Sequence, residues 1–339
     1  MKLALIGTGK IIADALVALQ PIDAIERRAI FARPHSRAKG AVLAAQYGIA
    51  AVYTDYAALL AQADIDTVYI GLVNSAHFSY GKQALEAGKN VIMEKPFTGT
   101  LAEARELVAL AREKNLYIFE AITVLHTPVF QRMRAGLPRL GRVRMLLGNY
   151  SQYSSRYDAY LAGEVSHAFD AAYLGGALRD INVYNVHYAA AFFGLPRAVH
   201  YYPNRGFNGI DTSGTLVLEY DGFSAVCTGA KDSDSPCYLS VQGEKGWMRI
   251  DGKPNVAPNL TLSYVREGGA GGETRDAAGA VVRETETEMF VPETGEHRMT
   301  QEFRDFARIA DTGDRAEADR LAAETLAVMQ IIEDALQDA

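Results

Sequence analysis

The sequence predicts an α/β protein with two domains, a doubly wound parallel sheet followed by a second α/β domain. The chain has 339 residues, more than one hydrophobic core usually organises. Short apolar runs alternate with Ala-rich helical stretches in the first part of the chain, whereas strand-like segments later follow one another directly. We therefore expect a first domain over residues 1–120 and a second over residues 121–339.

Continuous apolar runs in the first domain indicate buried strands, because strands covered on both faces do not alternate polar and apolar residues. The predicted strands are Leu3–Ile6, Arg28–Phe31, Thr67–Ile70, Asn90–Met93 and Leu116–Phe119. Helical patterns between them cover Ile11–Leu19, Ser36–Tyr47, His77–Ala87 and Leu101–Lys114. Strands joined through helices predict right-handed crossovers and therefore a parallel sheet.

The second domain is predicted to contain a sheet with one face exposed to water or covered by a partner, because several of its strands alternate polar and apolar residues. The predicted strands are Val143–Tyr150, Ala198–Tyr202, Gly214–Tyr220, Ser224–Ala230, Tyr238–Gln242, Trp247–Ile250, Asn259–Tyr264 and Thr285–Val291. A helical block over Gly175–Phe193 interrupts them, and residues 266–280 are predicted to form a surface excursion. Two closing helices have Thr300 and Asp314 as predicted caps, with Asp314 in capping-box spacing to Glu317.

Composition excludes several classes of function. The net charge of -7 and the lack of long basic runs argue against nucleic-acid binding. Two cysteines are too few for a disulfide framework, and the seven histidines lack metal-ligand spacing, so no metal site is expected. No secretory signal and no apolar run of the ~20 residues that span a bilayer are found. We expect a soluble cytoplasmic protein that acts on a small molecule.

A glycine-rich turn joins the first predicted strand to the first predicted helix. Gly7 permits the tight turn, Gly9 lets the backbone approach a pyrophosphate, and the small Ala13 lets helix and strand pack closely. Free N–H groups at the start of the helix can hold the anion. The turn predicts a Rossmann dinucleotide site, with contacts from Gly7, Thr8, Gly9, Lys10, Ile11 and Ile12.

The end of the second predicted strand favours NADP(H) over NAD(H). An Asp or Glu that would hold the adenosine ribose is missing from Ala32–Arg37. Arg33, Ser36 and Arg37 are instead predicted to hold a 2′-phosphate, because guanidinium groups pair well with phosphate. NAD(H) remains possible, since Ser36 could simply cap the next helix while the arginines stay solvated.

Two further motifs lie where an active site is expected. Lys95, in Glu94-Lys95-Pro96, follows a strand at the carboxyl edge of the sheet, where open α/β folds bind ligands. Asp180, Tyr184 and His187 are spaced by four and three residues, so they are predicted to share one helical face. The simpler alternatives are a surface charge at Lys95 and a packing role for Tyr184 between helix and sheet.

The glycine-rich turn, Glu94-Lys95-Pro96 and the Gly-Gly-Ala-Leu-x-Asp-Ile-x-x-Tyr segment together resemble the glucose–fructose oxidoreductase / inositol dehydrogenase / MocA family. The resemblance covers nearly the whole chain and includes Asn74, His77 and the turn over residues 242–246. It is greatest to the branch with dimeric dihydrodiol dehydrogenase, in which Tyr replaces the His of inositol dehydrogenases. The resemblance adds a set of cofactor-binding residues beyond the turn: Gly71, Leu72, Asn74, His77, Glu94, Lys95 and Pro96.

The resemblance implies hydride transfer between a nicotinamide and a hydroxyl or carbonyl carbon of a small polyol or sugar. It implies a second domain with a large, mostly antiparallel open sheet, often used for dimer contacts. Tyr184 would be the acid/base, Lys95 its electrostatic partner, and Asp180 the group that holds Lys95 or the substrate hydroxyl. The chemistry agrees, since a phenol has a pKa of about 10 and a nearby ammonium favours its ionised form.

The chain also departs from its relatives, so their substrates are not transferred. Thr123 and Leu125 stand where those relatives tend to have Trp and Arg, and Asn182 replaces a usual Gly. Substrate contacts are instead predicted from His126, Tyr153, Arg156 and His187, although the loop that contains Tyr153 and Arg156 could equally be solvated.

Two other functions stay open at this stage. A dinucleotide-binding sensor would use the same domains without catalysis, and the same fold could reduce a C=C bond or cleave glycosides.

Overall fold

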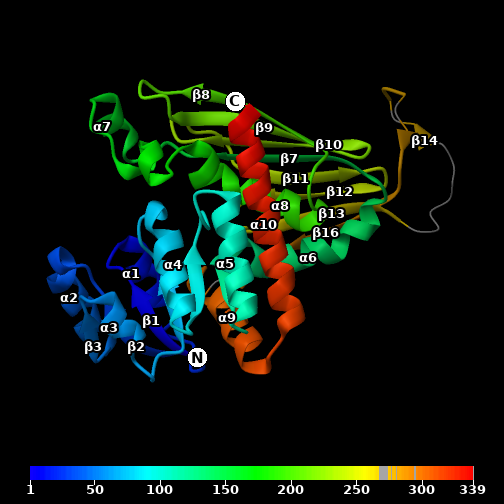
Figure 1. Cartoon of the computed structure of the whole chain (residues 1–339). Helices are drawn as coiled ribbons and strands as arrows, with labels where there is room; N and C mark the ends of the chain where they lie inside the picture. The colour runs from blue at the N-terminus through cyan, green and yellow to red at the C-terminus, as the bar shows by residue number, and fades with distance from the viewer. Residues whose placement is uncertain (267–273, 276, 280, 294, 339) are drawn as a thin grey trace.

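The structure is a computed structural model that describes residues 1–266, 274–275, 277–279, 281–293 and 295–338. Most strands belong to two sheets, one near each end of the molecule (Figure 1). The predicted excursion over residues 266–280 lies largely outside the described residues. Within the described residues, none of the helices combines the length and the apolar character needed to cross a membrane.

The first sheet is six-stranded and parallel, in the order β3-β2-β1-β4-β5-β6. Its strands are β1 (Lys2–Ile6), β2 (Glu26–Phe31), β3 (Ala51–Tyr53), β4 (Thr67–Ile70), β5 (Asn90–Glu94) and β6 (Ile118–Ala121). The predicted doubly wound parallel sheet is confirmed. The strand order reverses beside β1, and at such a reversal the carboxyl ends of the strands leave a crevice for ligands.

Helices connect these strands, and all of them except α3 (Tyr56–Leu60) were predicted. They are α1 (Lys10–Ala18), α2 (Arg37–Tyr47), α3 (Tyr56–Leu60), α4 (His77–Glu86) and α5 (Leu101–Glu113), with short 3-10 turns η1 (Pro34–Ser36) and η2 (Asn74–Ala76). Strand β3 was not predicted, because it is only three residues long and half-buried and so lacks a periodic signal. Ser36 does not cap α2 through its side chain, since its hydroxyl donates to the Arg33 carbonyl oxygen at 3.1 Å.

The second sheet is eight-stranded, in the order β16-β13-β12-β11-β7-β10-β9-β8. Its strands are β7 (Val143–Ser151), β8 (Ala198–Arg205), β9 (Asp211–Tyr220), β10 (Phe223–Ala230), β11 (Tyr238–Gly243), β12 (Gly246–Asp251), β13 (Leu260–Val265) and β16 (Thr285–Phe290). A separate pair joins β14 (Thr274–Arg275) and β15 (Val281–Val282). Neighbours in the eight-stranded sheet are antiparallel except for β7 and β10, which confirms the large, mostly antiparallel sheet.

Further helices follow the first sheet. They are α6 (Pro128–Gly136), α7 (Tyr157–Leu161), α8 (Val183–Phe193), α9 (Thr300–Thr312) and α10 (Arg315–Asp338), with 3-10 turns η3 (Thr123–His126), η4 (Leu137–Leu140), η5 (His167–Phe169) and η6 (Ala171–Tyr173) and a π-helical turn η7 (Leu178–Asn182). The predicted helix over Gly175–Phe193 therefore begins at Leu178. Its first turn is wider than an α-helical turn.

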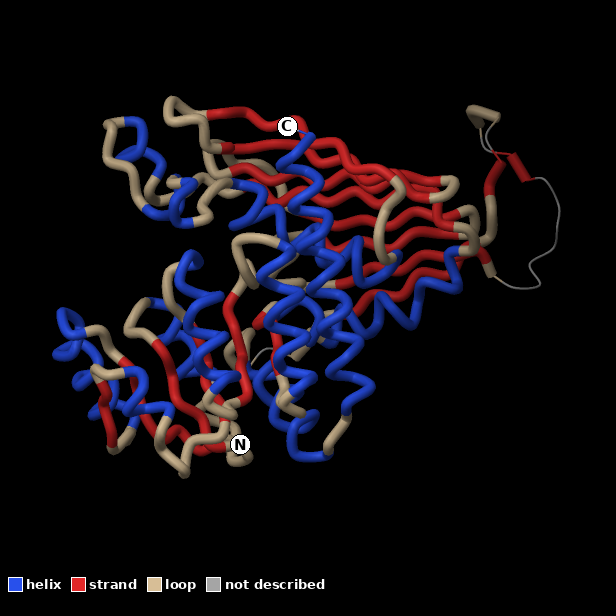
Figure 2. Tube along the Cα trace, viewed as in Figure 1, coloured by secondary structure: helices blue, strands red, loops and turns tan. Residues whose placement is uncertain are grey.

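Helix α8 packs against one face of the eight-stranded sheet. Its residues from Val183 to Ala190 are all buried, and Gly148 on β7 gives it room, since a Cβ there would lie 2.8 Å from Asn185 Oδ1. Figure 2 shows the helices of this domain gathered on that side of the sheet. The opposite face carries large exposed side chains, among them Trp247 and Met289, as the alternating pattern predicted.

The last two helices return to the first sheet. Thr300 was predicted to cap α9, but it does not do so. Its hydroxyl instead donates to the Ala18 carbonyl oxygen at 3.0 Å and anchors α9 to α1. Asp314 accepts from the Glu317 amide at 3.1 Å, as a cap does. Helix α10 contacts α5 and β6 of the first sheet as well as α8 and β8 (Figure 1).

Candidate active site

The glycine-rich turn has the geometry expected of an anion cradle. Gly7 has φ +128°, and a Cβ there would lie 2.8 Å from the Gly71 carbonyl oxygen, so the tight turn requires glycine. A Cβ at Gly9 would meet no atom of the described residues within 4 Å, so Gly9 borders open space. No side chain of the described residues caps α1 at Gly9. The first N–H groups of α1 therefore remain available for an anion.

A cleft of about 570 Å³ extends from this turn across the carboxyl ends of the parallel strands. Residues of both domains line it: Gly7, Thr8, Gly9, Lys10, Ile11, Asp14, Arg33, His35, Ser36, Lys39, Gly71, Leu72, Val73, Asn74, Arg156, His167 and Asp180. Most of the predicted cofactor-binding residues lie here. Ile12 does not, because it is fully buried and packs beneath Gly71.

The end of the cleft beside β2 is basic. Arg33, His35, Ser36 and Lys39 line it, whereas Arg37 is exposed outside it. Lys39, which lies two residues further along α2 than Arg37, lines the cleft instead. The sequence did not single out His35 or Lys39, because their placement depends on how α2 leaves the strand.

Lys95 and Asp180 meet between the two domains. Lys95 Nζ lies 2.9 Å from Asp180 Oδ1 and donates to the Asp180 carbonyl oxygen at 2.8 Å. The Lys95 side chain is 15% exposed. Burial opposes its charge, but the negative charge of Asp180 outweighs this and raises the pKa of Lys95. The ammonium is therefore held charged at the carboxyl end of β5.

Tyr184 lies beside this ion pair on α8. The Lys95 ammonium is 5.1 Å from the centroid of its ring, and the ring of Tyr150 packs against it with centroids 5.8 Å apart. Tyr184 is 7% exposed. The structure thus brings the three predicted catalytic residues together, one directly after β5, one in the π-helical turn and one in α8.

Asp180 has a second cationic neighbour. Lys231 Nζ lies 2.8 Å from Asp180 Oδ2, so each carboxylate oxygen contacts a different lysine. Burial alone would raise the pKa of Asp180, but the charges and hydrogen bonds of Lys95 and Lys231 hold it well below its usual range. Lys231 was missed at the sequence level. The available signal was its position directly after an apolar strand, which is the position that identified Lys95.

Comparison with known proteins assigns the chain to a family. Residues 1–121 match the model described as "Oxidoreductase family, NAD-binding Rossmann fold" (GFO_IDH_MocA), and residues 131–249 match the GFO/IDH/MocA C-terminal domain. The chain is 34% identical over 251 residues to scyllo-inositol 2-dehydrogenase (NADP(+)) IolU of Bacillus subtilis, covering 74% of this chain and 76% of that protein. The chain belongs to the GFO/IDH/MocA oxidoreductase family. It is an NAD(P)-dependent oxidoreductase.

Other members of the GFO/IDH/MocA family are also similar. Human trans-1,2-dihydrobenzene-1,2-diol dehydrogenase is 30% identical over 259 residues, which cover 74% of each chain. The structure of a levoglucosan dehydrogenase in complex with NADH and levoglucosan superposes with a TM-score of 0.81 at 19% identity, over 100% of this chain and 97% of that one. The latter similarity is one of fold.

Some residues expected to bind cofactor in this GFO/IDH/MocA enzyme lie behind the cleft instead. His77 is fully buried, and its ring nitrogens lie 3.0 Å from the Pro96 carbonyl oxygen and 3.4 Å from that of Leu72. Glu94 is buried and accepts from the Tyr69 hydroxyl at 2.5 Å. Both residues therefore support the loops that form the cleft rather than line it. Asn74 lines the cleft and donates to the Leu174 carbonyl oxygen at 3.3 Å, which joins the two domains.

The two histidines predicted to contact substrate are placed elsewhere, and the prediction is corrected. His187 is fully buried with Nε2 3.6 Å from Glu120 Oε2, because α8 is enclosed between the second sheet and α10. His126 is 6% exposed, with Nδ1 2.8 Å from Asp305 Oδ2 and its ring edge-on to Phe306. Neither ring borders the cleft.

Of the two residues predicted to contact substrate from the loop before α7, Arg156 lines the cleft and Tyr153 does not. Arg156 lines the cleft, together with His167 from the turn that follows α7. Tyr153 is 38% exposed and donates to Asp158 Oδ1 at 2.6 Å, in the adjoining helix α7. A guanidinium also reaches the end of β6, where Leu125 cannot supply one: Arg298, just before α9, donates to Thr123 Oγ1 at 3.4 Å.

Proposed function

We propose that this enzyme transfers hydride between NADP(H) and a hydroxyl or carbonyl carbon of a small polyol or sugar. The observation that carries the proposal is the convergence of Lys95, Asp180 and Tyr184 beside a cleft that starts at the glycine-rich turn. The relative named scyllo-inositol 2-dehydrogenase (NADP(+)) supports the cofactor and the substrate class.

The residues of the cleft fit a dinucleotide. The open space at Gly9 and the uncapped start of α1 suit a pyrophosphate. Arg33, His35 and Lys39 line the end where a 2′-phosphate would lie, and their cationic or hydrogen-bonding groups favour NADP(H). When bound, the nicotinamide supplies the hydride acceptor or donor.

In the oxidation direction, Tyr184 in its phenolate form accepts the proton of the substrate hydroxyl, while the carbon that bears this hydroxyl gives up its hydride. Lys95 places its ammonium beside the same oxygen and stabilises the negative charge that develops there. Asp180 accepts from Lys95 through Oδ1 and so fixes the position of the ammonium group relative to the substrate oxygen. In the reduction direction the same phenol returns the proton. Arg156, which lines the cleft from the second domain, is proposed to contact the substrate.

The test is turnover with a panel of substrates. Absorbance at the nicotinamide band is followed with NADP+ or NAD+ and inositols, pentoses, hexoses and an aromatic dihydrodiol. We expect at least one polyol or sugar to be oxidised, with NADP+ preferred. Tight NADPH binding without turnover of any substrate would support a sensor, and preference for NADH would reverse the assignment of the cofactor.

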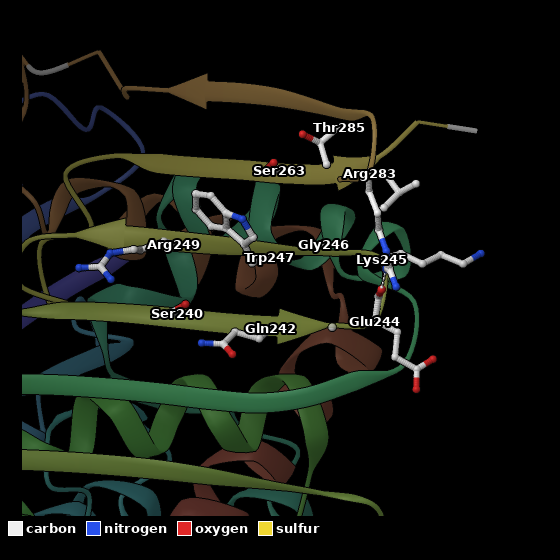
Figure 3. Close-up of a pocket in the computed structure, with 12 residues that line it drawn as sticks. Ser240, Gln242, Glu244, Lys245, Gly246, Trp247, Arg249, Ser263, Arg283 and Thr285 are labelled. Carbon is white, nitrogen blue, oxygen red and sulfur yellow. Dashed lines mark hydrogen bonds between the residues drawn. The ribbon is translucent and has the colours of Figure 1, made fainter. Parts of the chain in front are cut away.

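We further propose that the open face of the second sheet packs against a second copy of the chain. Met145, Trp247 and Met289 are 39%, 41% and 79% exposed on this face. Trp247 pairs with Gln242 on one side and Ser263 on the other, so these side chains share one row (Figure 3). A hollow of about 500 Å³ surrounds this row. Such an exposed apolar face is typical of an interface.

The oligomer is tested by light scattering after size-exclusion chromatography. Trp247→Glu is expected to convert a dimer or larger oligomer into a smaller species. Val42→Glu, at a 66% exposed site on α2, is the matched control and should leave the mass unchanged. A monomeric wild-type protein at micromolar concentration would contradict the proposal.

A further inference from the structure

Lys231 carries its ammonium into the interior directly after β10. Its side chain is 4% exposed, and Nζ lies 2.8 Å from Asp180 Oδ2. The same nitrogen donates to the Ala168 carbonyl oxygen at 2.6 Å and lies 4.5 Å from the centroid of the Phe169 ring. A buried ammonium is tolerated only where such partners replace water. The side chain is therefore held in one place by three contacts.

These contacts divide the Asp180 carboxylate between two lysines. Oδ2 contacts Lys231, which leaves Oδ1 aimed at Lys95. A carboxylate that contacts a cation through one oxygen can rotate about its Cβ–Cγ bond. A carboxylate that contacts a cation through each oxygen cannot rotate without losing a charge-assisted hydrogen bond. Because two ammonium groups share one carboxylate, the trio also keeps an excess positive charge next to Tyr184.

We propose that Lys231 is a positioning residue for the reaction: it locks Asp180 so that the Lys95 ammonium is held beside the substrate oxygen. The inference rests on the proposed function, since it assigns Lys231 a part in the same proton and hydride transfer. Lys231 does not line the cleft and acts through Asp180. Its loss lets the carboxylate swing, and Lys95 then follows it away from the reacting oxygen.

The contacts of Lys231 also include a segment that forms part of the wall of the cleft. Its carbonyl oxygen accepts from the Ser154 amide at 2.9 Å, and its own amide donates to the Thr212 carbonyl oxygen at 2.8 Å. Ala168, which its ammonium holds, follows His167 at the wall of the cleft. Through its ammonium, Lys231 thus joins the Asp180 carboxylate to the segment whose His167 lines the cleft.

The experiment compares Lys231→Met with a matched loss of another buried ammonium. Lys89 is 8% exposed and donates to the carbonyl oxygens of Gln62 and Ile65 at 2.8 and 2.7 Å, at the opposite end of the parallel strands from the cleft. Lys231→Met should lower kcat by about 10-fold to 100-fold, as small misplacements of a catalytic group do. The dissociation constant for NADPH should stay near wild type. Lys89→Met should leave kcat unchanged.

A double-mutant cycle separates positioning through Asp180 from general loss of structure. In an Asp180→Asn background, Lys231→Met should have little further effect on kcat, because the group that Lys231 positions is already impaired. Lys231→Arg, which keeps the positive charge, should retain more turnover than Lys231→Met. If Lys231→Met does not fold, Lys231→Gln is measured against the same criteria, since it keeps a hydrogen-bond donor without the charge.

Three outcomes would overturn the inference. The first is a wild-type kcat in folded Lys231→Met, and the second is a fall in kcat for the double variant equal to the product of the falls for Asp180→Asn and Lys231→Met. The third is a fall in kcat for Lys89→Met as large as that for Lys231→Met. A wild-type enzyme without turnover on any polyol or sugar would instead count against the proposed function. The two failures are therefore distinguished by the wild-type measurement alone.

Discussion

Lys95 Nζ and Asp180 Oδ1 lie 2.9 Å apart although 85 positions separate them in the chain. One residue follows a strand of the parallel sheet, and the other lies in the π-helical turn that leads into α8. Because the pKa of Lys95 is raised in the folded state, its contribution to folding stability is fully present below about pH 10. Because the pKa of Asp180 is lowered, its contribution is fully present above about pH 4. The pair is therefore intact between about pH 4 and about pH 10.

Replacing Lys95 by Met removes the ammonium from the proposed site. Turnover should become undetectable while the affinity for NADPH, measured by fluorescence titration, stays near wild type, because the glycine-rich turn is untouched. Lys82→Met is the control, since Lys82 pairs with Glu106 at the surface, 2.7 Å away. Retention of the wild-type rate in Lys95→Met would exclude Lys95 from the chemistry.

Tyr184→Phe removes the proposed proton acceptor and should lower kcat by about 10²- to 10⁴-fold. Tyr188, one turn further along α8, provides a matched buried phenol whose hydroxyl donates to the Pro254 carbonyl oxygen at 3.1 Å. Tyr188→Phe should leave kcat near wild type. Steady-state kinetics with the best substrate distinguish the two, and similar losses in both variants would indicate that α8 packing, not the phenol, matters.

Substitutions at the two glycines of the turn should separate folding from cofactor binding. Gly9→Val places its side chain in open space, so the midpoint temperature of unfolding should not change. The dissociation constant for NADPH should rise steeply, because the side chain would occupy the space of the pyrophosphate. Gly7→Ala strains a residue at φ +128° and clashes with Gly71, so it should lower the thermal midpoint. Unchanged NADPH binding by Gly9→Val would mean that the turn is not the site.

Cofactor choice should depend on the basic residues that line the cleft. Arg33→Ala and Lys39→Ala should weaken NADPH binding and leave NADH binding almost unchanged, because only NADPH carries the 2′-phosphate. Arg37→Ala, outside the cleft, should change neither dissociation constant. An equal loss for both cofactors would assign these residues to the rest of the nucleotide.

Glu324 predicts a pH dependence of stability. Burial, with a smaller contribution from Glu120, raises the pKa of its carboxyl to about 7, although His187 and Arg320 oppose the shift. Between about pH 4 and pH 7 the native state then binds more protons than the unfolded state, so stability falls as pH rises through this window. The expected fall is on the order of 3 kcal/mol. In Glu324→Gln the difference between urea unfolding at pH 5 and pH 8 should shrink; an undiminished difference would point to other groups.

Much of this arrangement could be predicted from sequence because it depends on local patterns. The continuous apolar strands gave the parallel sheet, and the position of Lys95 at a strand end placed it at the ligand-binding edge. Asp180 and Tyr184 were grouped by their four-residue spacing, and their catalytic roles were implied by the resemblance to a family.

The errors arose where long-range packing decides. His187 has the spacing of a site residue, but α8 is enclosed on both sides, so a side chain one turn past Tyr184 faces Glu120. Thr300 looks like a cap, yet the approach of α1 gives its hydroxyl another partner. Lys231 and Lys39 carry no periodic signal, and only the fold shows that Lys39 lines the cleft and that Lys231 contacts Asp180.

Helix α10 makes the two domains interdependent. Ala322 and Met329 complete the apolar core beneath α5, and Arg315 donates to the carbonyl oxygens of Asn115 and Leu116 at the edge of the first sheet. A fragment cut near residue 120 would therefore lack part of its own interior, because α10 supplies that part from far along the sequence. The nucleotide half therefore depends on α10 for its finished interior, so a fragment that ends before α10 is expected to be less stable than one that includes it.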